Sequence, residues 1–245
     1  MSPKRTLATS GRVLKQLGHD KRTLGLLFVV PVILLGLLSW ILSSLPTVFD
    51  AIGAPLLGLF PFIMMFIITS VTTLRERTGG TLERLLVMPV GKLDFLLGYA
   101  LSFGLVAIVQ AALATTMAVY VFGLDVQGPE WFLMVVALVD ALLGTALGLL
   151  SSAFARTEFQ AVQFMPAFVL PQTLLCGLLV PVAQLPTALH WLANCLPLTY
   201  AVDAMQRVAR EPVLSSRAGI DIAVIVSFVV VSLLLGAATL RRQTK

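Results

Sequence analysis

The chain has 245 residues, of which 58% are hydrophobic and only 12% are charged. Its mean hydropathy of +0.97 lies far above that of soluble globular proteins and excludes a soluble domain. The formal net charge of +5 does not indicate a nucleic-acid partner, because the basic residues flank apolar runs instead of forming one soluble block. The composition predicts an integral membrane protein embedded in a lipid bilayer.

A basic segment, residues 1–23, precedes the first apolar run. On a helix its basic residues, such as Arg12 and Lys15, fall on one side, and its apolar residues, such as Val13 and Leu17, fall on the other. This pattern predicts a short amphipathic helix at the membrane surface. A basic flank that only fixes the topology is an equally good interpretation from the sequence alone.

Six apolar stretches are long enough to cross a bilayer, since a spanning helix needs about 20 residues to cross a hydrocarbon core of about 30 Å. We therefore expect an all-α integral membrane protein with one transmembrane domain over residues 1–245. The expected transmembrane helices are 24–43, 55–74, 95–122, 131–155, 159–179 and 219–240.

The distribution of basic residues orients these helices. With the N-terminus in the cytoplasm, 14 of the 17 Lys and Arg residues fall on the cytoplasmic side. The opposite orientation would reverse this ratio, so the positive-inside rule predicts that both termini are cytoplasmic. The tryptophans then lie near the outer interface, where indole rings are favoured; they are Trp40, Trp131 and Trp191.

A charged segment, residues 75–94, separates the second and third apolar runs. Gly79 and Gly80 interrupt the preceding helix, and Thr81 can cap a new helix that Pro89 ends. In that helix three leucines recur at i, i+3 and i+4, and the charged residues between them point away; these are Leu82, Leu85 and Leu86, with Glu83 and Arg84. Such a short helix is marginal alone, so its apolar face needs a surface on which to dock.

The fourth expected helix carries Asp140, Gly144, Gly148 and Ser152 at steps of four residues. Gly144 and Gly148 form a GxxxG motif, which permits close packing of helices. Asp140 is costly in lipid and should face protein or water. It is either a site for a coupling proton or a substrate, or a hydrogen-bonded packing residue, and packing is the more common role.

The segment 180–218 follows a helix interrupted by Pro166 and Pro171. It contains two apolar or amphipathic stretches that are too short to span, Thr187 to Leu196 and Tyr200 to Arg210. As simple external loops they would expose much apolar surface. We expect short helices that re-enter the membrane from the outer side.

No sequence motif for catalysis is present. The chain has no GxxxxGK[ST] phosphate loop, no GxSxG and no HExxH motif. His19 and His190 fall on opposite sides of the membrane in this topology, so no metal site is predicted. An enzyme is not expected. A proton-coupled efflux carrier that uses Asp140 and a non-transporting membrane assembly protein both remain open.

Two stretches resemble the permeases of type-2 ABC exporters (ABC-2), in particular those of the daunorubicin-resistance type. The first is RERTGGTLERLLVMPVGKLDFLLGYAL, which is similar to the ER-x-x-GTLE-x-LL-x-x-P stretch of that family. The second is FMPAFVLPQTLLCGLLVPVAQLPTALHWLANCLPLTYAVDAMQRV, similar to the family's fifth helix and external segment. With six spans, the resemblance covers nearly the whole chain.

The resemblance implies the membrane-spanning permease of an ATP-driven exporter in the cell inner (plasma) membrane. Two copies of a separate ATP-binding subunit would bind ATP and Mg²⁺, and this chain would bind no cofactor. A second copy or a related permease would complete the dimer. Residues 81–88 would form the coupling helix, with its leucines in a cleft of the ATPase. The rim of that cleft would be contacted by the charged residues of this segment, which are Arg75, Glu76, Arg77, Glu83 and Arg84. The implied ATPase-coupling residues are Arg75, Glu76, Arg77, Thr81, Leu82, Glu83, Arg84, Leu85, Leu86, Arg156 and Glu158.

The resemblance also places the second and fifth helices around the translocation path, and the re-entrant segment at an external gate. The expected path residues are Phe62, Met65, Phe66, Thr69, Asp140, Phe164, Met165, Phe168 and Gln172. The expected gate residues are Leu185, Trp191 and Tyr200. A mostly apolar path would suit an amphipathic or lipophilic substrate, such as a drug, a lipid or a glycoconjugate, moved by alternating access.

Overall fold

The computed structural model describes residues 3–79 and 92–239, and every regular element in these two ranges is a helix. The elements are α1 (Pro3–His19), α2 (Lys21–Ile41), α3 (Pro46–Thr78), α5 (Lys92–Thr116), the π-helical turn η1 (Met117–Val121), α6 (Glu130–Ser151), α7 (Glu158–Leu175), the 3₁₀ turn η2 (Val182–Gln184), α8 (Thr187–Asn194), α9 (Pro197–Arg210) and α10 (Ser216–Thr239). The all-α class is confirmed for the described part of the chain.

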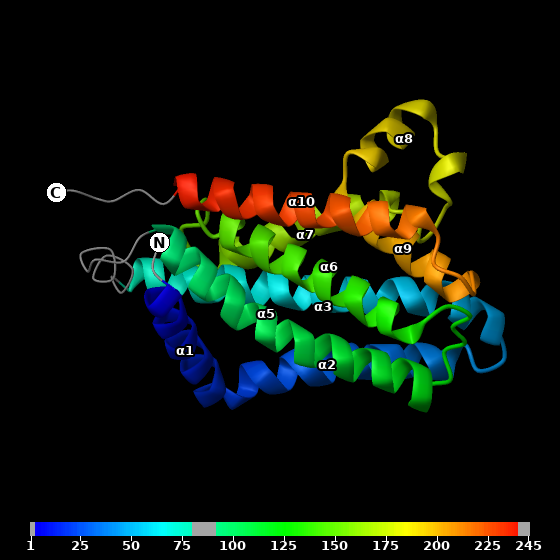
Figure 1. Ribbon diagram of the computed structural model, residues 1–245, viewed down its shortest axis with the longest axis horizontal. Coiled ribbons are helices and arrows are strands. Elements are labelled where there is room, and N and C mark those ends of the chain that lie inside the picture. Colours follow the sequence, from blue (N-terminus) through cyan, green and yellow to red (C-terminus); the bar gives the residue numbers. More distant parts are fainter. Residues whose placement is uncertain (1–2, 80–91, 240–245) are drawn as a thin grey trace.

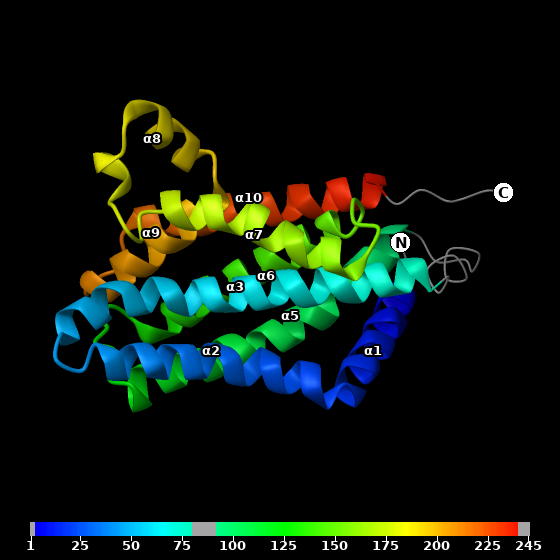
Figure 2. The ribbon, with the colours of Figure 1, turned by 180° about the vertical axis from the view of Figure 1, so that it is seen from behind.

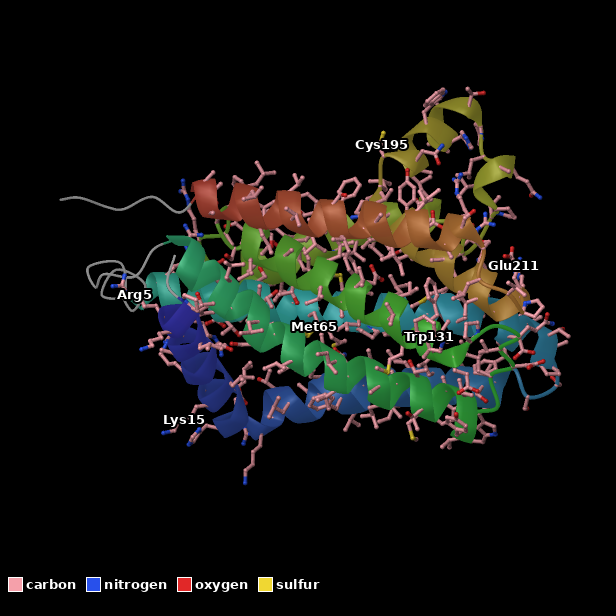
Figure 3. The ribbon with its side chains drawn as sticks, in the orientation of Figure 1. Arg5, Lys15, Met65, Trp131, Cys195 and Glu211 are labelled. Carbon is pink, nitrogen blue, oxygen red and sulfur yellow. The ribbon has the colours of Figure 1, made fainter. Side chains whose placement is uncertain are left out.

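The long helices run side by side along one axis (Figures 1 and 2). One end of this bundle, which we call the base, holds α1, the end of α3 and the end of α10. The opposite end, which we call the distal end, holds the turn between α2 and α3 and the loop between η1 and α6. Side chains mark the two ends: Arg5 and Lys15 lie at the base, and Trp131 and Glu211 lie at the distal end (Figure 3).

Five helices of the described residues are long and apolar enough to cross a membrane. They are α2, α3, the continuous helix Leu97–Val121, α6 and α10. The expected span 159–179 is not among them, because α7 ends at Leu175 and carries Glu158, several glutamines and two prolines. The structure thus supports a multi-pass membrane protein, and the sixth span stays a prediction.

Helix α3 begins earlier than the sequence pattern indicates. It starts at Pro46 and continues through Pro55 and Pro61 to Thr78, a length of 33 residues. Pro46 fits the first turn, where its missing N–H costs nothing, while interior prolines are tolerated where neighbouring helices surround them. One uninterrupted helix therefore connects the distal end to the base.

The amphipathic helix predicted at the N-terminus is present as α1. Val13 and Leu17 are buried, whereas Lys15 on the other side is exposed. The buried side contacts the first turns of α5 and the start of α2, and α1 crosses the base at a steep angle to the bundle (Figure 1). Its location against a membrane surface stays a prediction.

The GxxxG motif lies at the tightest contact of the bundle, between α3 and α6. A Cβ atom on Gly144 would collide with the carbonyl oxygen of Phe62, and a Cβ on Gly148 would collide with the hydroxyl of Thr69. These are close approaches of helix backbones that only glycine permits. The packing role predicted for the motif is confirmed.

The segment after α7 contains the two expected short helices. Helix α9 buries one full side, including Leu198, Met205 and Val208, against α3, α6 and α10. Helix α8 stands away from the bundle in both ribbon views (Figures 1 and 2), and Trp191 on it is exposed. That these helices re-enter the bilayer stays a prediction.

Substitution of Gly144 by alanine should destabilise the protein by about 2 kcal/mol or more, because the new methyl group would push α6 away from α3. Gly25→Ala is the matched control, since nothing lies within 4 Å of the Cβ position on this α2 glycine. Thermal unfolding in nanodiscs measures both variants. A Gly144→Ala protein that melts like the wild type would contradict the close contact between α3 and α6.

Candidate functional site

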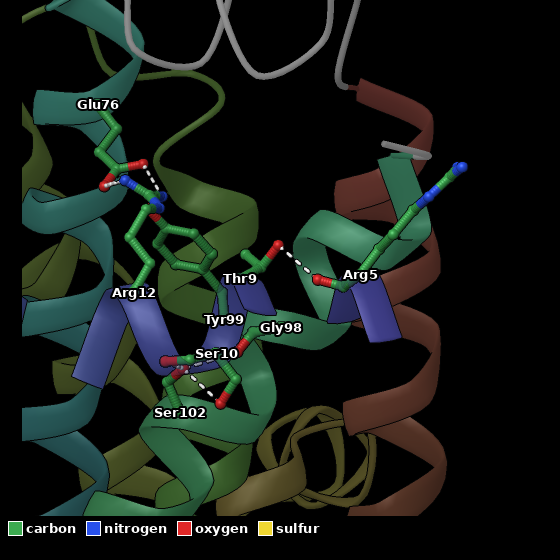
Figure 4. A network of polar contacts seen from close by, with 8 residues as sticks. All are labelled: Arg5, Thr9, Ser10, Arg12, Glu76, Gly98, Tyr99 and Ser102. Atoms are coloured by element: carbon green, nitrogen blue, oxygen red, sulfur yellow. Dashed lines mark hydrogen bonds and ion pairs between the residues drawn. The ribbon is translucent and has the colours of Figure 1, made fainter. Parts of the chain in front are cut away.

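The base of the bundle holds a partly buried ion pair between α1 and α3. Arg12 on α1 donates two hydrogen bonds to the carboxylate of Glu76, of 3.0 and 2.9 Å, and a third of 3.1 Å to the hydroxyl of Tyr99 on α5 (Figure 4). Glu76 is only 4% exposed. This network therefore joins three helices at one point.

The electrostatics of Arg12 favour the ion pair. Partial burial opposes the charge of its guanidinium, but the hydrogen bond and charge of Glu76, together with Tyr99, outweigh this effect and raise the pKa of Arg12. A bidentate pair of this kind fixes the orientation of both side chains. The end of α3 is consequently held in a defined position relative to α1.

A second contact brings α1 directly onto α5. The Ser102 hydroxyl lies 3.0 Å from the Ser10 hydroxyl and 2.8 Å from the carbonyl oxygen of Gly98 (Figure 4). A Cβ on Gly98 would lie 2.7 Å from the Cβ of Thr9, so a larger residue there would displace α1. The amphipathic helix is thus part of the packed structure and is held against α5.

A second ion pair at the base joins α3 to α7. Arg75 donates hydrogen bonds of 2.7 and 2.8 Å to the two carboxylate oxygens of Glu158. Both side chains are exposed, and the guanidinium of Arg75 lowers the pKa of the Glu158 carboxyl through this hydrogen bond. Two residues that the sequence predicts for ATPase coupling therefore contact each other.

The other residues predicted for ATPase coupling lie in several different places. Arg77 donates a 2.6 Å hydrogen bond to the carbonyl of Ser152, at the end of α6, and Arg156 lies in the turn before α7. Glu76 and Arg77 face into the protein and do not lie at an exposed rim as expected, because α3 continues to Thr78 and places them against α1 and α6. Residues 81–86 of the predicted set lie outside the described residues.

The expected path residues on α3 point into the packed core. Phe62, Met65, Phe66 and Thr69 are at most 1% exposed, and they face α6 or α5; Met65 lies in the middle of the bundle (Figure 3). They consequently line no open path in the single chain. The opposite side of α3 instead borders a cleft of about 280 Å³ between α1, α2 and α3.

The expected path residues on α7 are more open. Phe168 is 54% exposed and its ring packs edge-on against Phe164, with the ring centroids 6.1 Å apart. Met165 is half-buried, and Gln172 is buried with its amide donating to the carbonyl of Phe168 at 3.0 Å. Part of this helix is therefore available to a ligand or a second subunit.

Asp140 lies where α6 meets α3 and α9. It is fully buried, and neither carboxylate oxygen has a hydrogen-bond partner among the described residues. A Cβ on Gly58 would lie 3.3 Å from Oδ2 of Asp140 and would collide with Met205, so the three helices meet tightly here. The structure does not show the hydrogen-bonded packing role that we considered more common.

Of the three expected gate residues, Tyr200 lines a distal pocket of about 350 Å³, together with His190 and Arg207, whereas Leu185 and Trp191 do not line it. Tyr200 donates a 2.7 Å hydrogen bond to the carbonyl of Asn194, which ties α9 to α8. Leu185 lies between η2 and α8 and only partly exposes its side chain. Trp191 is an exposed residue of α8, and the role of the three residues as a gate stays a prediction.

The sequence model of the ABC-2 type transporter family matches residues 6–209. The chain belongs to this family. The resemblance found in the sequence is confirmed at this level. In this ABC-2 protein the match includes α1 from Thr6 onward, both ion pairs at the base, and α9 up to Ala209.

Several curated relatives are similar to this ABC-2 chain. ABC transporter G family member 20 of Dictyostelium discoideum is 32% identical over 161 residues, which are 65% of this chain and 22% of the relative. The probable multidrug ABC transporter permease YbhR of Escherichia coli is 28% identical over 62% of this chain and 42% of its own length. The inner membrane transport permease YhhJ of Escherichia coli is 26% identical over 60% and 39%. The match thus spans less than half of the length of each of these relatives.

Removal of the Arg12 side chain should destabilise the protein by about 2 kcal/mol or more, because it leaves the buried Glu76 carboxylate without its counter-charge. Lys15→Ala is the matched control, as Lys15 is an exposed basic residue of the same helix. Thermal unfolding measures both variants, and the melting temperature of Arg12→Ala should be lower than that of Lys15→Ala. Equal melting temperatures would contradict the structural role of the ion pair.

Proposed function

We propose that the chain is the membrane-spanning permease subunit of an ABC exporter that moves an amphipathic or lipophilic substrate out of the cytoplasm. The observation that carries this proposal is the ABC-2 family match over residues 6–209. It is supported by the multi-pass helix bundle and by the names of relatives that are described as multidrug transport permeases. The base of the bundle would face the cytoplasm, in agreement with the positive-inside rule.

Energy would come from a separate ATP-binding subunit, because the chain contains no phosphate loop of its own. Two such subunits would bind ATP and Mg²⁺ and act on a dimer of this permease or on a pair with a related one. The helix predicted over residues 81–88 would dock on the ATPase through Leu82, Leu85 and Leu86. Its charged residues would lie at the edge of that contact.

The two ion pairs at the base offer a route for the movement. The docking segment directly follows α3, so its displacement would pull on the end of this long helix. Glu76 would pass the displacement to α1 and α5 through Arg12 and Tyr99, and Arg75 would pass it to α7 through Glu158. A displacement of the docking segment would then move α1, α3, α5 and α7 together, as a concerted rearrangement for alternating access requires.

The distal end would provide the second gate of the cycle. Helix α9 is packed on α3 and α6, so a shift of α3 would displace α9. The shape of the distal pocket, which residues of α9 line, would then change. When the base closes, α9 and residues such as Tyr200 would open the outer side. Hydrolysis would reset the protein.

A proton-coupled carrier is the second candidate, and the burial of Asp140 without a hydrogen-bond partner favours it. A carboxyl group in such surroundings could bind and release a proton during transport. The two candidates differ in their energy source and can be separated directly.

Co-expression with an ABC ATP-binding subunit should yield a complex that co-purifies. Leu85→Asp should reduce the co-purified ATPase by about tenfold or more, because a buried leucine contact would be replaced by a charge. Arg84→Ala is the control for the same helix and should change capture by less than about fivefold, as expected for an exposed charge. Undiminished capture by Leu85→Asp would refute docking through the leucines.

Efflux by the complex should continue in the presence of a proton uncoupler while ATP is held constant, and should stop when ATP is removed. Asp140→Asn, which preserves the size of the side chain, should then transport normally if its proton is not used. Loss of efflux on uncoupling, or in Asp140→Asn with normal folding, would favour the carrier. ATP-driven uptake of an externally added fluorescent drug into inverted membrane vesicles provides the measurement.

A further inference from the structure

The cleft of about 280 Å³ lies at the elbow between α1 and α2, against one side of α3. Its apolar wall contains Met64, Ile67, Ile68 and Val71, which recur at helical spacing on α3, and Leu26 on α2. These α3 residues are half-buried, in contrast to the fully buried residues on the opposite side of the helix. The cleft is therefore the side of α3 that a molecule could reach.

The mouth of the cleft is polar and lies at the base. Asp20, Thr23 and Arg75 line it. The charge of Arg75 is already balanced by the bidentate contact with Glu158. Lys21 and Arg22, which follow Asp20, are exposed and do not line the cleft. Asp20 also interacts electrostatically with Arg75, so Asp20, Arg75 and Glu158 together carry one net negative charge, and the carboxylate that lines the mouth is that of Asp20.

Asp20 is held in place as the N-cap of α2. Its carboxylate accepts hydrogen bonds from the backbone N–H and the hydroxyl of Thr23, at 3.1 and 2.6 Å. These hydrogen bonds lower the pKa of Asp20, so it is ionised at neutral pH. Each oxygen can accept a further hydrogen bond, and the side chain is exposed to a ligand.

We propose that this cleft binds a lipophilic amine, with its aliphatic body along Met64, Ile67 and Ile68 and its ammonium group at the carboxylate of Asp20. The volume suits one aliphatic chain or a small aromatic body, near the lower end of ligand sites in proteins. The proposal deepens the proposed function, because it names the substrate class and moves the contact surface to the side of α3 opposite Phe62 and Met65.

The test uses dodecylamine that carries a photoreactive diazirine near its methyl end. The whole chain is placed in nanodiscs of neutral phosphatidylcholine, illuminated with the probe, and the adducts are located by mass spectrometry. We expect adducts on Met64, Ile67 and Ile68. Unlabelled dodecylamine should compete, and uncharged dodecanol should compete about fivefold less well, as expected for one partly exposed charge contact.

Two variants and one control sharpen the result. Ile67→Trp should lower cleft labelling by about tenfold or more, because the indole fills the space. Asp20→Asn retains an N-cap residue for α2 and should remove the advantage of the amine over the alcohol. Ile108→Trp, on the outward side of α5 and 41% exposed, is the matched control and should leave labelling unchanged.

Adducts spread evenly over the outward sides of α5 and α10 would show lipid-like partitioning and overturn the proposal. Equal competition by dodecanol would overturn the role of Asp20. Binding of the amine is measured without an ATPase, so failure of this proposal can be distinguished from failure of the proposed permease function. A chain that captures the ATPase but is not labelled in the cleft would keep the permease function and lose this inference. A chain that is labelled in the cleft but captures no ATPase would keep the amine site and lose the proposed ABC permease function.

Discussion

The close contact between α3 and α6 is the constraint on which the bundle depends. In lipid, helices are not driven together by the hydrophobic effect, so they rely on close packing of their backbones. Gly144 and Gly148 allow α6 to meet the carbonyl groups of Phe62 and Phe66. Because α3 also contacts α2, α7 and α9, its position relative to α6 fixes most of the molecule.

Two buried acids on these helices have opposite surroundings. Glu76 at the base is fully paired with Arg12, whereas Asp140 nearer the distal end has no partner for its carboxylate among the described residues. A paired acid holds a structure in place, and an unpaired one is costly and needs another explanation. The base of the bundle therefore holds an acid that ties helices together, whereas the acid on α6 contributes no such polar contact among the described residues.

Much of the fold could be predicted because apolar length and small-residue spacing are local properties. The spans around α2, α6 and α10, the amphipathic α1 and the role of Gly144 all follow from such patterns. Which side of α3 is buried could not be predicted, since a helix that is apolar on every side gives no signal of which side faces the core. The pairs Arg12–Glu76 and Arg75–Glu158 join residues far apart in the chain, and no periodicity indicates them.

The docking of α1 has a consequence for biosynthesis. Its partners are Glu76 and Ser102, which follow Arg12 and Ser10 in the chain by 64 and 92 residues. During translation α1 is made before α3 and α5, so at first only its apolar contacts with the start of α2 can form. The hydrogen bonds of Arg12 and Ser10 can therefore form only after the third apolar run has been made. Helix α1 reaches its final place later than its position in the chain would indicate.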